Sequence, residues 1–317
     1  MRAVGVMNYG GPEALEIVEV PEEHAGPGQV RLRVHAAAVN PTDTYVRNGA
    51  RAEMQRDLPP PYVPGMDAAG IVDEVGDGVT TGLAVGDRAM AIVVPHGAHG
   101  AYRQSLVLPA ESVTLAPAGT THAEASTLPM NGLTARLSLD LLGLTPGQTL
   151  AVTGAAGAYG GYVVQLAKAD GLTVIADASE ADTELVRSLG ADFVVARGDD
   201  VAERIRQLAP NGVDGLADGA VQNELVIPAV ADGGAFTSIR GFRPDADPAL
   251  TRGIAFTVTM VRDYQLDWAR LDHLRQQAEG GQLTLRVADV YPATEAAAAH
   301  ARLEAGGTRG RCVIDLS

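Results

Sequence analysis

A run of small residues, Val152 to Gly161, carries the strongest chemical signal in the sequence. It reads VTGAAGAYGG and lies between an apolar run at 149–153 and a helix-like segment at 162–168. Glycine and alanine let a backbone approach a pyrophosphate, and a helix N-terminus offers free N–H groups to it. The run therefore predicts a dinucleotide site. Its G-x-x-G-x-x-G spacing departs from the usual G-x-G-x-x-G, so alone it is also compatible with a tight connection.

An acidic residue supports this prediction. Asp177 comes 20 positions after Gly157, at the end of the next apolar run, where a carboxylate accepts hydrogen bonds from an adenosine ribose. The alternative is a solvated turn aspartate. Asp218 and Arg240 follow later apolar runs and would border the same edge, although either is equally compatible with a structural role. The candidate cofactor-binding residues at the loop itself are Gly154, Ala156, Gly157, Ala158, Tyr159 and Gly160.

The elements that must position these residues predict two domains. A chain of 317 residues, 46% of them hydrophobic, is long enough for two cores. Up to about residue 115, short β-like runs such as 30–34 and 70–75 alternate with glycine and proline, which favours a β-rich domain. From about residue 120 a helix-like segment at 123–142 leads into alternating strands and helices. Such alternation predicts a doubly wound parallel sheet, with strands at 149–153, 173–176, 192–195, 213–217, 235–239 and 256–260.

The remaining segments are less informative. The tail predicts helices at 268–279 and 294–303 and a strand at 311–316, whereas 49–64, with four prolines and several charges, predicts an exposed loop. The net charge of -15 disfavours nucleic acid and anionic membranes as partners. No membrane span or leader is evident, so we expect a soluble, cytoplasmic protein.

Metal binding through cysteine or histidine has little support in the sequence. The single cysteine, Cys312, excludes an intrachain disulfide and a zinc site built on several thiolates, and its apolar surroundings favour a buried packing role. His96 and His99 lie in a glycine-broken loop, with His122 further on. We expect surface or cleft-lining polar residues there and no metal.

Several motifs together resemble a known family. They are 40–49 (NPTDTYVRNG), 64–70 (PGMDAAG), 75–76 with 85–89, 132–135 (GLTA), the glycine run and 310–314. In this order they resemble the quinone oxidoreductases, the zinc-free, zeta-crystallin-like branch of the medium-chain dehydrogenase/reductase superfamily. The resemblance implies a GroES-like catalytic domain at 1–118 and 263–317, a Rossmann domain at 119–262, and an active site in the cleft between them. It also implies cofactor contacts at Asn131 and Thr134, and a homodimer paired through the last Rossmann strand near 256–261.

The resemblance further implies how the site works. Where zinc-dependent relatives have cysteine, histidine and cysteine as zinc ligands, this sequence has Asn40, Met66 and Thr127. These three side chains make a poor set of zinc ligands. Hydride transfer to a quinone or α,β-unsaturated carbonyl suits such a site, because the oxygen that gains charge needs only a hydrogen bond. Tyr45 and Asn40 are the predicted donors, with Arg262 third. Tyr45 is also compatible with a packing aromatic, and Asn40 with a turn-bracing amide.

Two other functions and two cofactors stay open. The alternatives are an enoyl-type reductase of a specialised-metabolite intermediate, and a non-enzymatic NADPH-binding, crystallin-like protein.

The family pattern favours NADPH, held by small polar and basic side chains after the second Rossmann strand. Residues 176–182 read ADASEAD, which offers Ser179 but no basic residue. We expect NADPH, with NAD as the alternative if Asp177 and not Ser179 faces the ribose.

Overall fold

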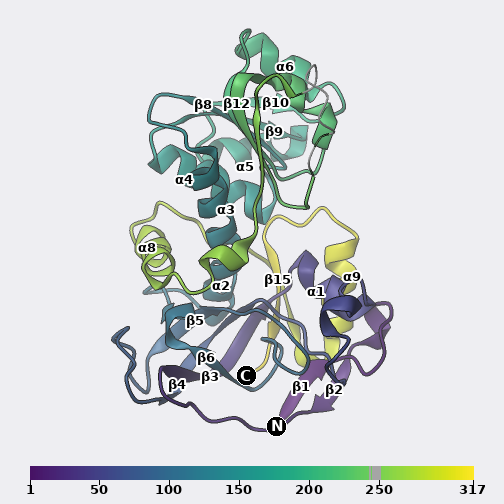
Figure 1. Cartoon of the computed structure of the whole chain (residues 1–317), viewed down its shortest axis with the longest axis vertical. Helices are drawn as coiled ribbons and strands as arrows, with labels where there is room; N and C mark the ends of the chain where they lie inside the picture. The colour runs from purple at the N-terminus through teal and green to yellow at the C-terminus, as the bar shows by residue number, and fades with distance from the viewer. Residues whose placement is uncertain (243, 245–250) are drawn as a thin grey trace. The chain divides into compact units, whose positions relative to one another are not determined.

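The chain folds into two compact units. The computed structural model describes residues 1–242, 244 and 251–317. The first unit comprises Met1–Met130, Arg262–Gly281 and Leu285–Ser317, and the second comprises Asn131–Val261 and Gln282–Thr284 (Figure 1). Residues 119–130 therefore belong to the first unit, although the sequence placed them in the second. The physical reason is that α2 (His122–Ser126) packs on β3, β4 and β15 of the first unit.

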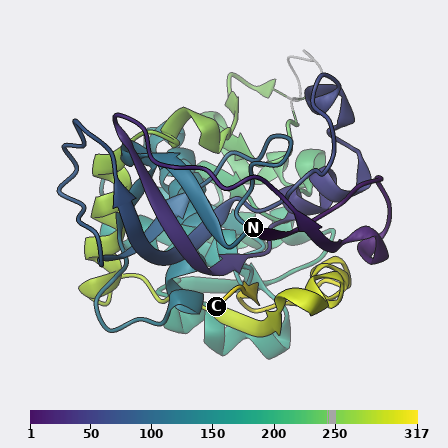
Figure 2. The ribbon, with the colours of Figure 1, turned by 90° about the horizontal axis from the view of Figure 1, so that it is seen from below.

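The first unit is built around a sheet in the order β14-β15-β3-β4-β5-β7, with β6 also paired to β3 and a separate β1-β2 pair. In β3, side chains alternate between buried and less buried positions, as expected for a sheet with one face on the core. β15 pairs antiparallel with β3, with Val313 opposite Ala38, so the end of the chain completes this sheet (Figure 2). Its strands are β1 (Arg2–Gly5), β2 (Glu16–Glu19), β3 (Gln29–Ala38), β4 (Asp67–Val75), β5 (Arg88–Ile92), β6 (Ser105–Pro109), β7 (Val113–Leu115), β14 (Val287–Pro292) and β15 (Arg311–Asp315).

One predicted helix is two helices in the structure. The segment 123–142 divides into α2 and α3 (Pro129–Leu142), because a residue that precedes proline is disfavoured in the helical conformation. The predicted exposed loop at 49–64 is exposed at 50, 53–54 and 56–60, whereas Gln55, Val63 and Pro64 are buried. The other helices of the first unit are α1 (Pro41–Asn48), α8 (Trp268–Glu279) and α9 (Ala296–Glu304). Short 3₁₀ turns across the chain are η1 (Pro12–Ala14), η2 (Ala52–Gln55), η3 (Ala110–Ser112), η4 (Glu180–Asp182), η5 (Asn223–Leu225), η6 (Ile227–Ala229), η7 (Val261–Tyr264) and η8 (Ala293–Glu295).

The second unit is a parallel six-stranded sheet in the order β10-β9-β8-β11-β12-β13. This is the doubly wound Rossmann order, in which the carboxyl ends of the two central strands, β8 and β11, flank the point where the strand order reverses. Its elements are β8 (Thr149–Thr153), α4 (Ala158–Ala169), β9 (Thr173–Ala178), α5 (Thr183–Ser188), β10 (Phe193–Ala196), α6 (Val201–Leu208), β11 (Val213–Asp218), β12 (Val230–Ser238) and β13 (Ala255–Val258).

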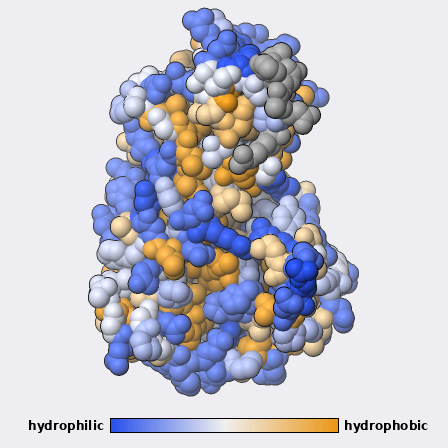
Figure 3. Space-filling view, in the orientation of Figure 1, coloured by the Kyte–Doolittle hydropathy of each residue, from blue (hydrophilic) through white to orange (hydrophobic). Residues whose placement is uncertain are grey.

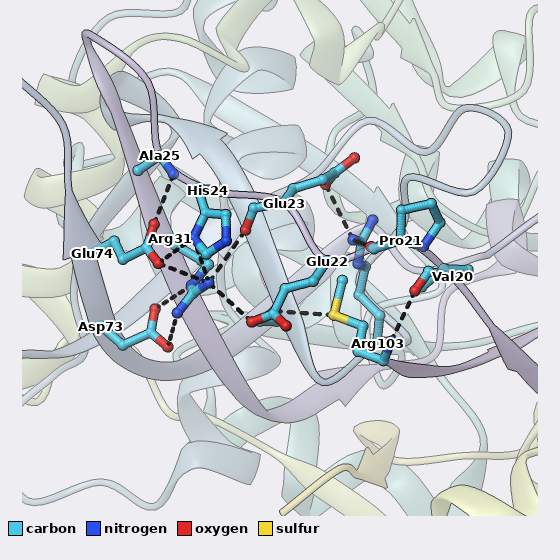
Figure 4. Close-up of polar contacts among 12 residues, drawn as sticks. Val20, Pro21, Glu22, Glu23, His24, Ala25, Arg31, Asp73, Glu74 and Arg103 are labelled. Atoms are coloured by element: carbon cyan, nitrogen blue, oxygen red, sulfur yellow. Dashed lines mark hydrogen bonds and ion pairs between the residues drawn. The ribbon is translucent and has the colours of Figure 1, made fainter.

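Apolar residues fill the cores of both units. In the second unit, Ile205 of α6 packs with Ile175, Leu216 and Phe236 of the sheet. The face in Figure 3 is mostly hydrophilic, with apolar groups between the charged ones. Figure 4 shows one cluster of ion pairs in the first unit. Arg31 lies among acidic groups there and pairs with Asp73 at 2.9 Å and Glu74 at 2.7 Å. No helix among the described residues is long and apolar enough to cross a membrane.

Candidate functional site

The glycine run forms a tight turn between β8 and α4. Gly154 has φ +67°, in the left-handed region that favours glycine, and Gly157 precedes the first residue of α4. A Cβ at Gly160 would lie 2.3 Å from the carbonyl oxygen of Gly154, so only glycine fits where the helix approaches the turn. The helix begins at Ala158, four residues before the predicted start. The backbone at 154–158 therefore stands at a helix N-terminus, where N–H groups can hold an anion.

Asp177 braces this turn from the end of β9. Its Oδ1 atom accepts hydrogen bonds from the backbone N–H groups of Gly154, at 2.6 Å, and Ala155, at 3.3 Å. The side chain is buried, and burial raises its pKa, whereas the two backbone N–H groups and the charge of Arg197 act in the opposite direction. Asp177 thus faces the glycine turn and not open solvent.

Ser179 is already engaged by a second carboxylate. Its hydroxyl donates a hydrogen bond to Asp182, which is buried. The nearest basic side chains considered from the sequence pair elsewhere: Lys168 with Asp192, at 2.7 Å, and Arg187 with Glu184, also at 2.7 Å. The end of β9 therefore carries carboxylates where a 2′-phosphate would need positive charge.

The side chains of two other predicted cofactor residues point into the protein interior. Asp218 is 0% exposed, and it accepts hydrogen bonds from Thr153 Oγ1 at 2.6 Å and from the N–H groups of Gln222 and Asn223 at 3.1 and 2.8 Å. Tyr159 is buried and donates its hydroxyl hydrogen to Ser138 Oγ at 2.7 Å. Asp218 thus supports the turn after β11, whereas Tyr159 joins α4 to α3, and neither side chain presents a group at the surface.

The remaining predicted cofactor residues vary in exposure. On α3, Asn131 is buried and Thr134, one turn later, is half-buried. Ala156 and Ala158 of the turn are half-buried. Arg240 is exposed just after β12. The fold thus brings the turn, Asp177 and Asp218 together at the carboxyl ends of β8, β9 and β11, where doubly wound sheets bind nucleotides.

In the first unit, Asn40 braces the start of α1. It is 0% exposed, and its Nδ2 donates to Asp67 Oδ2 at 2.6 Å and to the carbonyl of Ala38 at 3.4 Å. Its backbone N–H donates to Asp43 Oδ2 at 2.8 Å. These contacts match the turn-bracing alternative, and the predicted role of Asn40 as a donor to substrate finds no support in them.

Asn40 connects two buried carboxylates that the sequence did not mark as functional. Asp43 also accepts from the Gly65 N–H at 3.0 Å and the Tyr102 hydroxyl at 3.2 Å, and Asp67 accepts from the Met130 N–H at 2.6 Å. Burial raises the pKa of Asp43 to about 6 and that of Asp67 to about 7. The family motif 64–70 was the sequence signal for Asp67, but nothing in it indicated a contact with α3.

Tyr45 lies on α1 with its side chain partly exposed. The backbone N–H of Arg51 donates to the carbonyl oxygen of Tyr45 at 3.4 Å. The Arg51 guanidinium is half-buried, and its pKa is lowered first by burial and second by the nearby charge of Arg262. Tyr45 and Arg51 are thus joined through the backbone in the first unit, to which Arg262 also belongs. Arg51 was missed because it falls in a segment that resembled an ordinary exposed loop.

Comparison with known proteins agrees with this architecture. Residues 26–118 match the alcohol dehydrogenase GroES-like domain, and residues 189–314 match the zinc-binding dehydrogenase family. A 2-haloacrylate reductase from Burkholderia sp is 32% identical, with 98% of each chain covered. Quinone oxidoreductase from Rattus norvegicus is 35% identical, covering 61% of this chain and 58% of the relative. The chain belongs to the quinone oxidoreductase branch of the medium-chain dehydrogenase/reductase superfamily.

Solved structures agree along the whole chain. One described as an NAD-dependent alcohol dehydrogenase has 32% identity and a TM-score of 0.87, with 100% of both chains covered. A mycobacterial protein solved in complex with NADPH has 28% identity and a TM-score of 0.86, covering 99% of this chain and 100% of that one. Against the first curated relatives, by contrast, the match spans only 53–60% of their length.

Zinc, which other members of the superfamily use, does not fit the residues present. At the expected ligand positions, Asn40 donates to Asp67, Met66 is a buried thioether, and Thr127 donates its hydroxyl to the carbonyl of Glu124 at 2.8 Å. The rings of His96 and His99 lie tilted against each other, at 4.8 Å between centroids, and His122 stacks with His35 at 4.7 Å. Among the described residues, no group of three or more metal-ligating side chains is placed to hold an ion.

Proposed function

We propose that the protein is a nicotinamide-dependent reductase that transfers hydride to a quinone or an α,β-unsaturated carbonyl. The observation that carries the proposal is the turn at 154–160, where glycines, a helix N-terminus and a bracing carboxylate combine. The residues present fit a dinucleotide, because a Cβ at Gly160 would displace the turn that exposes the N–H groups. The names of the relatives above support reduction of quinones and activated alkenes.

The first unit supplies the group that meets the substrate oxygen. A bound nicotinamide cofactor would supply the hydride. We propose that the Tyr45 hydroxyl donates a hydrogen bond to the carbonyl oxygen that gains charge, since a phenol stabilises such charge without a metal. The hydrogen bonds between Asn40, Asp43 and Asp67 fix the start of α1, and so place Tyr45 one turn into the helix. Asn40 thus acts as a positioning residue in this proposal.

For the cofactor we propose NADH in preference to NADPH. The family pattern favoured NADPH on condition that Ser179 faces the ribose. In the structure the hydroxyl of Ser179 donates to Asp182 instead. Asp177 holds the glycine turn through Oδ1 alone, which leaves Oδ2 to accept from a ribose hydroxyl. The charge of Arg197, which acts on Asp177, would instead favour a 2′-phosphate.

Turnover tests the proposed activity. The purified protein is mixed with NADH or NADPH and a panel of quinones and enones, and loss of absorbance by the reduced cofactor is followed. We expect steady consumption that depends on the second substrate and falls about 10- to 100-fold in Tyr45→Phe. Cofactor binding without turnover of any substrate in the panel would favour the crystallin-like alternative. Turnover confined to enoyl thioesters would favour the enoyl-type reductase.

The cofactor proposal has its own test. The ratio of kcat/KM for NADH to that for NADPH is measured in the wild type, Asp177→Ser and Arg197→Ala. We expect the wild-type ratio to exceed one and to reverse in Asp177→Ser, because loss of the carboxylate removes both a ribose ligand and a repulsion of the 2′-phosphate. A wild-type preference for NADPH that Arg197→Ala abolishes would contradict the proposal.

We also propose a homodimer, paired through β13. This strand is the edge of the six-stranded sheet, and most of its residues are half-buried. An unpaired edge of this kind is a template for another strand, and closed symmetric pairing would cover it. Sedimentation at micromolar concentration should give twice the 32.8 kDa chain mass. A monomer there, or a dimer that survives Thr257→Pro unchanged, would count against pairing through β13.

A further inference from the structure

We propose that Tyr102 and His300 are positioning residues of the reductase, because together they tie α1, the helix that carries Tyr45, to α9. This inference rests on the proposed function and adds two residues that its site requires. The two helices come from opposite ends of the chain and lie side by side in the first unit (Figure 1). A chain of hydrogen bonds runs between them, and its members are all buried: Arg47, His300, Tyr102 and Asp43.

This chain of hydrogen bonds leaves α1 at Arg47 and returns to it at Asp43. The Arg47 guanidinium lies 3.3 Å from His300 Nδ1. The Tyr102 hydroxyl lies 3.2 Å from His300 Nε2 and also 3.2 Å from Asp43 Oδ2. Residues four apart share a face of a helix, whereas Tyr45, two residues from each, projects from the other side and is partly exposed. The contacts therefore hold α1 by one face and leave the other face to Tyr45.

The chemistry of the donors fixes the direction of each hydrogen bond. An arginine side chain can only donate, so His300 Nδ1 must accept from Arg47. A neutral imidazole then carries its hydrogen on Nε2, which donates to the Tyr102 oxygen. The hydroxyl hydrogen of Tyr102 is left for Asp43, which accepts it as a carboxylate. Burial and the charge of Arg47 lower the pKa of His300 to about 3, in agreement with a neutral ring.

Asp43 ends the chain of hydrogen bonds because it is surrounded by donors. Besides the Tyr102 hydroxyl, its oxygens accept two backbone N–H groups, at 2.8 and 3.0 Å. A proton on this carboxyl would have to displace one of these donors. The chain cannot reverse to make room, since a hydrogen on His300 Nδ1 would meet the Arg47 donor. The connection between the two helices is thus complete only while Asp43 is ionised.

Arg47 also anchors α1 through its other nitrogens. NH2 donates to Glu304 Oε1 of α9 at 2.6 Å, and Nε donates to the carbonyl oxygen of Gly10 at 3.2 Å. Glu304 lies one turn after His300, so both contacts come from the same face of α9. Loss of a partner within this network would leave buried donors unsatisfied, which is costly. A change at His300 or Tyr102 therefore alters how firmly α1 is held.

Other charged groups act on Asp43 from neighbouring elements. Burial raises its pKa to about 6, although the hydrogen bonds that it accepts and the charge of Arg311 in β15 lower it. Asp67 of β4 and Arg51 after α1 also interact with its charge. We expect kcat/KM to fall as the pH drops through about 6, since protonation of Asp43 breaks the connection. Tyr102→Phe removes a donor to this carboxylate and should move the midpoint to higher pH by about 0.5–1. The hydroxyl hydrogen of Tyr102 goes to Asp43 and not to Asp67, so this shift would identify Asp43.

Turnover by matched variants tests the positioning role. The variants are Tyr102→Phe, His300→Gln and His300→Asn. The control is Arg302→Gln, on the same helix as His300 but bonded to the Gly306 carbonyl at 2.7 Å. We expect Tyr102→Phe to lower kcat about 10-fold and to change the KM for the reduced cofactor by less than about 2-fold, because the glycine turn lies in the second unit. Glutamine can replace Nε2 as the donor to Tyr102, so His300→Gln should retain more activity than His300→Asn. An unchanged kcat in Tyr102→Phe, or an equal loss in the control, would overturn the proposal.

Hydrogen exchange separates this inference from the proposed function. Exchange of the backbone N–H groups of residues 41–49 is followed by mass spectrometry, which needs no turnover. We expect exchange to be about 5-fold faster in Tyr102→Phe and His300→Asn than in the wild type, and to be unchanged in Arg302→Gln. Unchanged exchange in the first two variants would refute the connection between α1 and α9, even in an active reductase. Faster exchange in a protein that turns over no substrate would refute the reductase and leave the connection standing.

Discussion

Asp67 in the first unit and Asp177 in the second perform the same local task under different conditions. Each accepts a backbone N–H at the start of a helix, Met130 in the first turn of α3 and Gly154 just before α4, both at 2.6 Å. Asp67 is 0% exposed, and a second oxygen is taken by Asn40, whereas Asp177 is 4% exposed and uses one oxygen for both of its N–H donors.

The difference shows how a helix-bracing carboxylate becomes available for a ligand. With both oxygens taken and no exposed surface, Asp67 can only hold structure. At the carboxyl end of β9, Asp177 accepts the backbone N–H with Oδ1 alone. Its Oδ2 therefore lies available at the edge of the sheet where nucleotides bind. The two residues therefore make opposite predictions for stability and for cofactor binding.

The largest expected effect is on stability, in Asp67→Ala. The substitution removes an acceptor of the buried Met130 N–H and the closer acceptor of the Asn40 amide, whose contact with the Ala38 carbonyl is 3.4 Å long, and this should lower the free energy of unfolding by about 3–5 kcal/mol. Asp177→Ala should cost only about 1–2 kcal/mol, because water can reach its N–H groups at the strand end. Urea unfolding measures both. Equal losses would remove the distinction between the two carboxylates.

The second expected effect is on the stability and the cofactor affinity of the glycine turn. Gly160→Ala places a Cβ 2.3 Å from the Gly154 carbonyl oxygen, and we expect a loss of about 2 kcal/mol and a weaker affinity for the cofactor. Gly157→Ala is the control within the same turn, since its Cβ would lie 3.1 Å from that oxygen and its φ is -71°. Calorimetric titration with NADH should rank the variants accordingly. A Gly160→Ala protein with wild-type affinity would show that the turn does not hold the cofactor.

The fold was predictable to the extent that local patterns determine it. The strands of the second unit are short apolar runs between turns, and each lies within a few residues of its predicted place. The break before Pro129 was visible as a proline, yet the apolar pattern continued through it. The glycine turn was predictable for the same reason, because its small residues and its neighbours are contiguous.

The site was less predictable because its decisive contacts join distant residues. Asp67 and Met130 are 63 positions apart, Asn40 and Asp67 are 27 apart, and Gly154 and Asp177 are 23 apart. The sequence placed Asp177 at the right edge but could not show that it faces the turn. Asp43 and Tyr102, whose hydroxyl donates to it, are 59 positions apart, so no spacing rule predicts their contact. Residues 243 and 245–250 lie outside the part of the chain that the structure describes.

The third prediction concerns pH and uses the raised pKa of Asp67. The folded-state value of about 7 lies above the ordinary value of an aspartate, about 3.9, so the folded protein binds more protons between these limits. This group's contribution to stability is therefore fully present below about pH 4 and is lost as the pH rises through about 7. Relative to Asp67→Asn, which cannot ionise, the wild type should lose up to about 4 kcal/mol across that window, because the pKa is raised by about 3 and each pKa unit corresponds to about 1.4 kcal/mol. Urea unfolding from pH 4 to 8 measures the difference, and parallel curves would refute it.

The smallest expected effect lies in the turn that Asp218 holds after β11. Val221 has φ +58°, a left-handed conformation that is costly for a β-branched residue, and Asp218 fixes it by accepting from the N–H groups of Gln222 and Asn223. Glycine would remove a strain of about 1–2 kcal/mol while costing about 0.5–1 kcal/mol in chain entropy. Val221→Gly should therefore stabilise the second unit by roughly 0.5 kcal/mol. Asn223→Gly is the control, since asparagine tolerates its φ of +55° and should gain nothing. If thermal unfolding shows Val221→Gly to be destabilising, then packing of the half-buried valine outweighs its backbone strain, and Asp218 holds a relaxed turn just as Asp67 holds a relaxed helix end.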